Sequence, residues 1–288
     1  MTVAAKYNSL AEIRGKPWIV VIIALFYIIL IAVVSFVKPS SFDWNESFYP
    51  ASQELLHGRS PYSIPTFLSV PWTLIPLLPF ALLPERIGSA ALFVTSALIF
   101  AWVAYRLGAR GIWIAIFFFS PPLIHSLWLG NVDALSLMGF LLPPQIGLFF
   151  ILMKPQMGMV MAVFWLVEAW RQNGIKQIIK VFFPVAAALL LSFVIFGNWT
   201  ATRGLNPINT FWNSSWWPWS IPFGLVLTAL SLRDRRRDLA MAASPFLSPY
   251  IAHGSWICVV AALLPKKLEL SVAVIGMWII FVIRALQM

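Results

Sequence analysis

The sequence has few of the features that a soluble enzyme or a secreted domain carries. Only 10% of its 288 residues are charged, whereas about 25% is usual in soluble domains. A single cysteine, Cys258, excludes an internal disulfide and a cysteine-rich metal cluster. With only three histidines and no Walker loop, GxGxxG or HExxH motif, the sequence predicts neither a cofactor nor a bound metal.

What the chain has in abundance is apolar sequence. Apolar residues make up 60% of it, and apolar runs approach the length of about 20 residues that a membrane-spanning helix needs. The sustained alternation typical of a membrane β-barrel is lacking. We therefore predict an all-α, polytopic transmembrane protein with about 8–10 apolar segments, some of them short or re-entrant. Neither an internal repeat nor a linker divides the sequence, so we expect a single membrane domain over residues 1–288.

The formal net charge of +10 is concentrated in short basic stretches such as Arg233–Arg237. In a membrane protein such stretches indicate cytoplasmic loops, and we expect no nucleic-acid partner. Basic residues also precede the first apolar run, Trp18–Val37. We interpret this run as a retained first helix with a cytoplasmic N-terminus.

The second apolar block, Phe67–Leu83, contains three prolines and should be kinked, broken or re-entrant. If this block does not cross the membrane, the next run, Ile87–Tyr105, delivers Arg106 and Arg110 to the cytoplasmic side, as the charge rule requires. The later apolar segments are Ile112–Leu129, Asn131–Leu142, Gln145–Met153, Pro155–Trp170, Val181–Phe196, Ser220–Leu232, Leu239–Ala252, Ser255–Leu264 and Leu270–Leu286.

A polar island, Ser41–Tyr62, follows the first run and forms the first outer loop; Gly197–Trp217 forms a second loop on the same side. Within the island, Asn45–His57 predicts a short helix lying in the membrane interface, with Gly58 as its C-terminal cap. Asp43 stands just before this helix. Its carboxylate is either an N-terminal cap or a general base for an acceptor hydroxyl.

Five further ionisable residues are candidates for a site. Asp133 either caps a helix or lines the mouth of a cavity. Lys154 interrupts a strongly apolar run, so it either reaches towards water or binds a phosphate or carboxylate. Arg59 and Arg203, in the two outer loops, are loop charges or phosphate ligands. His253 is an acid or base group, or a side chain bonded to backbone.

Several short motifs agree in order with one enzyme family. They are Asp43 with Ala51, Leu55-Leu56, Gly58 and Pro61-Tyr62; the prolines Pro76 and Pro79; Gly130-Asn131-Val132-Asp133; Lys154-Pro155-Gln156; and Ser248-Pro249-Tyr250 with His253. In this the chain resembles the GT-C-type integral membrane glycosyltransferases, and among them the bacterial polyprenol-phosphate-mannose-dependent mannosyltransferases. The chain is short for that family, and few segments follow Lys154.

The resemblance implies transfer of a hexose, mannose-like, from a polyprenyl-phosphate donor to an acceptor at the outer membrane face, without a metal. It places Asp43 as the general base and makes Lys154, Gln156, Asp133, Arg59, Arg203 and His253 the candidate substrate-binding residues. The expected partners are the lipid-linked donor and membrane lipids, and the resemblance implies a membrane of the bacterial inner (plasma) type. One alternative is a non-catalytic subunit that keeps the scaffold and binds other membrane subunits; a third is a small lipid transporter or flippase.

Overall fold

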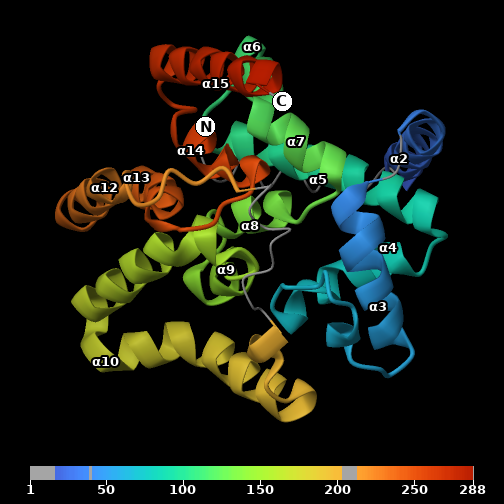
Figure 1. The fold of residues 1–288 in the computed structure, drawn as a ribbon, viewed down its shortest axis with the longest axis horizontal. Coiled ribbons are helices and arrows are strands. Elements are labelled where there is room, and N and C mark those ends of the chain that lie inside the picture. The colour runs from blue at the N-terminus through green and yellow to red at the C-terminus, as the bar shows by residue number, and fades with distance from the viewer. Residues whose placement is uncertain (1–16, 39–40, 203–212, 288) are drawn as a thin grey trace.

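We describe the fold from a computed structural model, which places residues 17–38, 41–202 and 213–287 (Figure 1). Helices dominate this part of the chain, which contains no β-strand; one isolated β-bridge joins Asn213 to Ala252. The predicted all-α class is thereby confirmed. The membrane class is confirmed in its coarse form, because several helices are apolar and long enough to cross a bilayer.

The helices differ widely in length. The longer ones are α2 (Pro17–Val37), α5 (Glu85–Arg106), α10 (Pro155–Phe196), α12 (Ile221–Asp234) and α15 (Lys267–Gln287). The shorter ones are α3 (Tyr49–Leu56), α4 (Leu78–Ala81), α6 (Ile112–Phe118), α7 (Pro121–Leu129), α8 (Asp133–Gly139), α9 (Pro144–Ile151), α13 (Arg237–Ala243) and α14 (Ile257–Ala262). Proline stands in the first turn of α7, α9 and α10, where its missing N–H costs no intrahelical hydrogen bond.

Short helical turns complete the described part of the chain. A π-helical turn, η1 (Trp44–Phe48), leads directly into α3. The 3₁₀ turns are η2 (Pro61–Ser63), η3 (Pro71–Thr73), η4 (Ile75–Leu77), η5 (Trp199–Thr202), η6 (Ser244–Leu247) and η7 (His253–Trp256). The predicted glycine termination of the island helix is observed: Gly58, with a φ of 71°, follows the C-cap residue His57 of α3, and its N–H donates to the Leu55 carbonyl at 3.0 Å.

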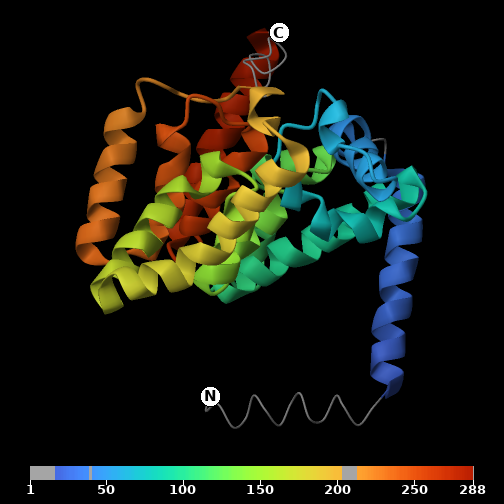
Figure 2. The ribbon, with the colours of Figure 1, turned by 90° about the horizontal axis from the view of Figure 1, so that it is seen from below.

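Three described helices, α2, α5 and α10, are each long and apolar enough to cross a membrane. A fourth span is formed if α6 and α7, which meet at a bend of 60°, are counted together. None of the most apolar stretch of α2 is buried inside the protein, and Figure 2 shows α2 projecting as a rod away from the other helices. Its apolar side chains therefore suit contact with lipid rather than with the protein core.

The proline-rich block Phe67–Leu83 is broken, as predicted. It contains η3, η4 and the four-residue α4 instead of one long helix. At about 1.5 Å per residue, these pieces fall far short of the roughly 30 Å of a bilayer core. If α5 is the one crossing after the island, Arg106 and Arg110 lie on the side opposite to Asp43, in agreement with the charge rule.

The polar stretch 171–180 is helical and belongs to α10. That helix bends sharply at Asn173 and Gly174, whose backbone angles are not helical. The bend lies against the basic stretch at the end of α12: Arg171 donates a hydrogen bond of 2.8 Å to the Leu232 carbonyl, and Arg235 approaches Glu168 at 3.6 Å. Residues 171–180 of α10 and the basic residues 233–237 at the end of α12 are therefore on the same side of the protein, as expected for cytoplasmic segments.

The polar island contacts the end of α10 through aromatic rings. Tyr62 stacks on Trp199 with ring centroids 5.5 Å apart, and Trp199 stacks on Phe193 at 5.4 Å. The indole N–H of Trp199 donates to Ser192 at 3.0 Å. These contacts bring the island and the beginning of the second predicted loop together; residues 203–212 of that loop lie outside the described residues.

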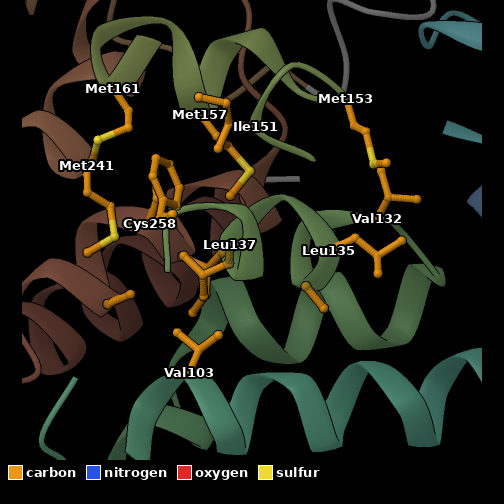
Figure 3. Close-up of a cluster of buried hydrophobic side chains, with 14 of the residues drawn as sticks. Val103, Val132, Leu135, Leu137, Ile151, Met153, Met157, Met161, Met241 and Cys258 are labelled. Atoms are coloured by element: carbon orange, nitrogen blue, oxygen red, sulfur yellow. The ribbon is translucent and has the colours of Figure 1, made fainter. Parts of the chain in front are cut away.

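The core lies where α5, α8, α10, α13 and α14 meet. Figure 3 shows its aliphatic and sulfur-containing side chains packed between these helices, with Leu137 of α8 between Val103 of α5 and Cys258 of α14. Met157 and Met161 of α10 and Met241 of α13 fill the side of the cluster that is away from α5. Burial of such side chains removes apolar area from contact with the surroundings and holds the short helices in fixed positions.

Two glycines let α8 and α9 approach closely. A Cβ on Gly147 would lie 2.6 Å from the Gly139 carbonyl oxygen, and one on Gly139 would lie 2.6 Å from the Cβ of Phe150. No larger residue fits without separating the helices. The close contact fixes the beginning of α8, which carries Asp133, relative to the turn after α9, which carries Lys154.

Candidate functional site

The turn between α7 and α8 touches the polar island directly. Gly130 ends α7 in the left-handed conformation, with a φ of 69°. A Cβ at this position would lie 2.9 Å from the Cβ of Ser41 and 3.0 Å from that of Trp44. Glycine is therefore needed both for its backbone angle and for the space, and it presents Asn131 to the island.

We expect Gly130→Ala to destabilise the protein and to displace Asn131 from Asp43. The added methyl group meets Ser41 and Trp44, and both of these residues are fully buried. The expected cost is about 1–3 kcal/mol, the usual range for overpacking a core. Thermal unfolding in detergent measures it. Gly58→Ala is the matched control, because Gly58 also has a positive φ but nothing lies within 4 Å of its added Cβ; an equal loss in both variants contradicts the packing argument.

The side chain of Asp43 is hydrogen-bonded to the side chain of Asn131. The Asn131 amide Nδ2 donates to Asp43 Oδ2, while the Val132 backbone N–H donates to Asn131 Oδ1 at 2.7 Å. The second bond fixes which end of the amide faces the carboxylate. The interpretation of Asp43 as a helix cap is wrong, because its side chain caps no N–H group and its own backbone is already helical.

The pKa of Asp43 is raised to about 6. Burial is the main cause, because it disfavours the charged carboxylate, and the negative charge of Asp133 adds to the effect. The positive charge of Lys154 and the hydrogen bond from Asn131 act in the opposite direction. A carboxylate with this pKa is mostly ionised at neutral pH and still accepts a proton readily.

Lys154 forms a buried ion pair with Asp133. Its Nζ lies 2.7 Å from Asp133 Oδ1, and the two side chains are only 8% and 1% exposed. Ser255 completes the group, since it accepts from Lys154 at 3.3 Å and donates to Asp133 at 2.9 Å. The expectation that Lys154 might reach towards water is wrong, and Asp133 is the anion that meets its charge. Asp133 caps nothing; it is the first residue of α8 and anchors the lysine.

Asp43 and Lys154 line the same cavity, which has a volume of about 410 Å³. Its polar lining includes Asp43, Glu46, His125, Asn131, Lys154, Gln156 and Tyr250. Its apolar lining includes Phe42, Phe48, Leu68, Leu129 and Met153. We call this the Asp43 cavity. It combines two carboxylates, an ammonium group and neutral hydrogen-bonding groups with apolar walls, as small-molecule sites do.

The beginning of α10 also faces the Asp43 cavity. Lys154 is the residue before the helix, and Pro155 and Gln156 form its first turn; all three line the cavity. Backbone N–H groups at a helix start lack intrahelical partners and give this end a partial positive charge. The end of the cavity that contains Lys154 is therefore the more favourable end for an anion.

Two predicted site residues, Arg59 and His253, do not line the cavity. Arg59 binds Glu54 through two hydrogen bonds of 2.6 and 2.8 Å, and its side chain is 59% exposed. The His253 ring centroid lies 5.3 Å from that of His125, which does line the cavity. Arg203 lies outside the described residues. The structure thus brings Asp43, Lys154 and Gln156 to the lining of one cavity, and Asp133 holds Lys154 through their buried ion pair.

Sequence reasoning assigned no role to several residues that line the cavity, among them Glu46, His125, Asn131 and Tyr250. His125 lies in a predicted span, about one helical turn before the Gly130 turn, and that spacing is the signal that could have identified it. Asn131 and Tyr250 were recognised only as parts of motifs. Their positions depend on the packing of α7 and of the segment before η7 against the island, which no local pattern contains.

Within residues 17–38, 41–202 and 213–287, no group of three or more histidine, cysteine or acidic side chains is arranged to hold a metal ion. The chain matches no protein-family model, no curated protein and no solved structure.

Proposed function

We propose that the protein is a membrane glycosyltransferase that moves a hexose from a polyprenyl-phosphate donor to an acceptor hydroxyl. The observation that supports this most strongly is the placement of Asp43 and Lys154 on one cavity of about 410 Å³. A base for the acceptor hydroxyl and an oriented donor for the leaving phosphate are two elements that serve such a transfer. An open cavity with both elements also favours an enzyme over a subunit that merely keeps the scaffold.

In the proposed reaction, Asp43 accepts the proton of the acceptor hydroxyl. The acceptor oxygen forms a bond to the anomeric carbon of the sugar as the bond from that carbon to the phosphate oxygen breaks. The electron pair of the broken bond stays on the leaving polyprenyl phosphate. Asp43 is suited to its part because Asn131 holds Oδ2 and fixes the carboxylate in the cavity wall.

The leaving phosphate is proposed to lie at the Lys154 end of the cavity. Lys154 has three N–H donors; Asp133 and Ser255 accept two of them, and one remains for a phosphate oxygen. Because Asp133 balances the lysine charge, Lys154 acts here mainly as an oriented hydrogen-bond donor. The positive end of α10 and the Gln156 amide supply further attraction for the developing negative charge.

The proposed membrane arrangement follows the charge distribution. The basic stretches 171–180 and 233–237 face the cytoplasm, and the island with the Asp43 cavity faces the outer side of a bacterial-type plasma membrane. In this arrangement a polyprenyl chain lies in the bilayer while its head group enters the cavity. The apolar lining residues Phe42, Phe48 and Leu129 suit contact with the first isoprene units.

The test is a transfer assay on the purified full-length protein in lipid nanodiscs. The protein is supplied with polyprenyl-phosphate mannose or polyprenyl-phosphate glucose and with a membrane lipid extract as the source of acceptor. We expect sugar-dependent release of polyprenyl phosphate, detected by mass spectrometry. The proposal is contradicted if the protein neither binds nor turns over any polyprenyl-phosphate hexose.

The pH dependence of transfer offers a second test. Asp43 acts as a base only when ionised, and its pKa is about 6. The rate should therefore be nearly constant above pH 7 and fall about tenfold per pH unit below about pH 6. The hydrogen bond from Asn131 lowers the pKa of Asp43, so Asn131→Ala should move the midpoint to higher pH. A profile that remains flat down to pH 4 contradicts the assignment.

A further inference from the structure

A second cavity, of about 340 Å³, lies where the end of α2 meets the beginning of α5. Its lining includes Ser35, Lys38, Asn45, Glu85, Arg86 and Ser89. No lining residue is shared with the Asp43 cavity. Because the apolar span of α2 ends at residue 37, this α2–α5 cavity lies at the end of the membrane-spanning stretch, where lipid head groups are found.

Arg86 is the main cation of the α2–α5 cavity. Its Nε donates to the Ser35 carbonyl and its Nη2 donates to the Phe36 carbonyl at 3.2 Å, so the guanidinium is oriented by the last turn of α2. These bonds use two of its five N–H donors. Arg86 forms no ion pair with a carboxylate in the described part of the chain, so its charge is oriented but not neutralised.

Lys38 adds a second cation on the α2 side. Its Nζ donates to the Ser41 hydroxyl and to the Trp128 carbonyl at 3.2 Å. Burial lowers the pKa of Lys38 to about 8; a nearby anion would raise it again. The one carboxylate of the cavity wall, Glu85, accepts a hydrogen bond from Asn45. Two cations and one carboxylate give the lining a net positive charge.

The surroundings of the cavity are apolar and open to the bilayer. Phe36 and Val37, at the end of α2, are 80% and 78% exposed, and Ile87, beside Arg86, is 40% exposed. Figure 2 shows α2 extending beyond the other helices below this end, and the Tyr27 hydroxyl of α2 is hydrogen-bonded to the Thr95 hydroxyl of α5 at 2.7 Å, so the face of α2 turned away from α5 is accessible to acyl chains. A molecule that carries an anionic head group on apolar chains matches this combination; a free anion in water matches only the charged part.

We propose that the α2–α5 cavity binds the phosphate group of an anionic phospholipid of the surrounding bilayer, with Arg86 and Lys38 as its cationic ligands. The bound lipid joins the end of α2 to the beginning of α5 and so holds the polar island, which lies between these helices in the sequence. Arginine suits this role because its planar guanidinium can bind a phosphate through two N–H groups. The inference is independent of the chemistry at Asp43.

Native mass spectrometry of the full-length protein tests this proposal. The purified, delipidated protein is titrated with phosphatidylglycerol or with phosphatidylcholine of identical acyl chains. We expect one phosphatidylglycerol molecule to be retained under conditions that remove phosphatidylcholine, and Arg86→Gln to weaken its binding at least tenfold. Lys38→Gln should weaken it as well, and it keeps the test informative if the Arg86 variant folds poorly.

Arg106→Gln is the matched control, because Arg106 is an exposed arginine at the other end of α5 and lies outside the cavity. Equal losses in the Arg86 and Arg106 variants would show only general attraction between basic residues and anionic lipid, and would overturn the proposal. Equal retention of the two lipids by the wild-type protein would also overturn it. Inorganic phosphate provides a third arm: if it binds with the same Arg86 dependence while the lipid does not, the ligand is a free anion and the lipid assignment is wrong.

Discussion

Asp43→Asn is expected to lower the rate of sugar transfer by about 10²- to 10⁴-fold, the usual contribution of a general base. The replacement is isosteric, and the new amide oxygen can still accept the hydrogen bond from Asn131. The fold and the cavity should therefore survive, while the group can no longer take a proton from the acceptor. Donor binding should change little, because the proposed phosphate position is at the Lys154 end of the cavity.

The measurement compares initial transfer rates, donor binding and thermal unfolding of the two proteins in nanodiscs. Glu54→Gln is the control, because it removes another carboxylate of the same island that pairs with Arg59 at an exposed position. It should leave transfer within about twofold, since exposed ion pairs contribute about 1 kcal/mol or less. Unchanged turnover in Asp43→Asn, with the Glu54 control behaving as stated, rules out the general-base role.

Much of the fold could be predicted from the sequence because its signals are local. The long apolar run of α2, the prolines that break the Phe67–Leu83 block and the glycine after α3 each act over a few residues. The sequence separates Pro155–Trp170 from Val181–Phe196 by a polar stretch, and α10 breaks within that stretch, at Asn173 and Gly174. The angle of the bend depends on tertiary contacts such as that of Arg171 with the Leu232 carbonyl, which the sequence does not show. Local patterns set where helices form, whereas packing sets how they turn.

The candidate site was predictable only in part. An aspartate and a lysine in apolar surroundings draw attention because an isolated charge is costly there. Their partners are separated from them by long stretches of chain: Asn131 reaches Asp43 across 88 positions, and Asp133 reaches Lys154 across 21. Such pairings depend on the tertiary arrangement. Arg59 differs, since Glu54 lies only five positions away across the turn at Gly58, and that local pairing could have been anticipated.

The pairing of Lys154 with Asp133 determines what a substitution of the lysine would do. Lys154→Met keeps the length of the side chain but leaves Asp133 buried without its cation. Breaking a buried pair in this way costs about 3–5 kcal/mol, which is a large part of the stability of a typical domain. We therefore expect the single variant to unfold at a markedly lower temperature and to be recovered in low yield.

The double variant Asp133→Asn with Lys154→Met separates the structural role of the pair from its proposed role in binding. Both replacements are neutral and close in shape, so no uncompensated charge remains and most of the lost stability should return. Transfer should stay impaired, because the third N–H of Lys154 is proposed to meet the donor phosphate and methionine has no donor to replace it. Thermal unfolding and donor binding are measured for the wild type, both single variants and the double variant. If the double variant regains full donor affinity together with its stability, Lys154 is only a structural partner of Asp133, and the phosphate must be held by other groups of the Asp43 cavity.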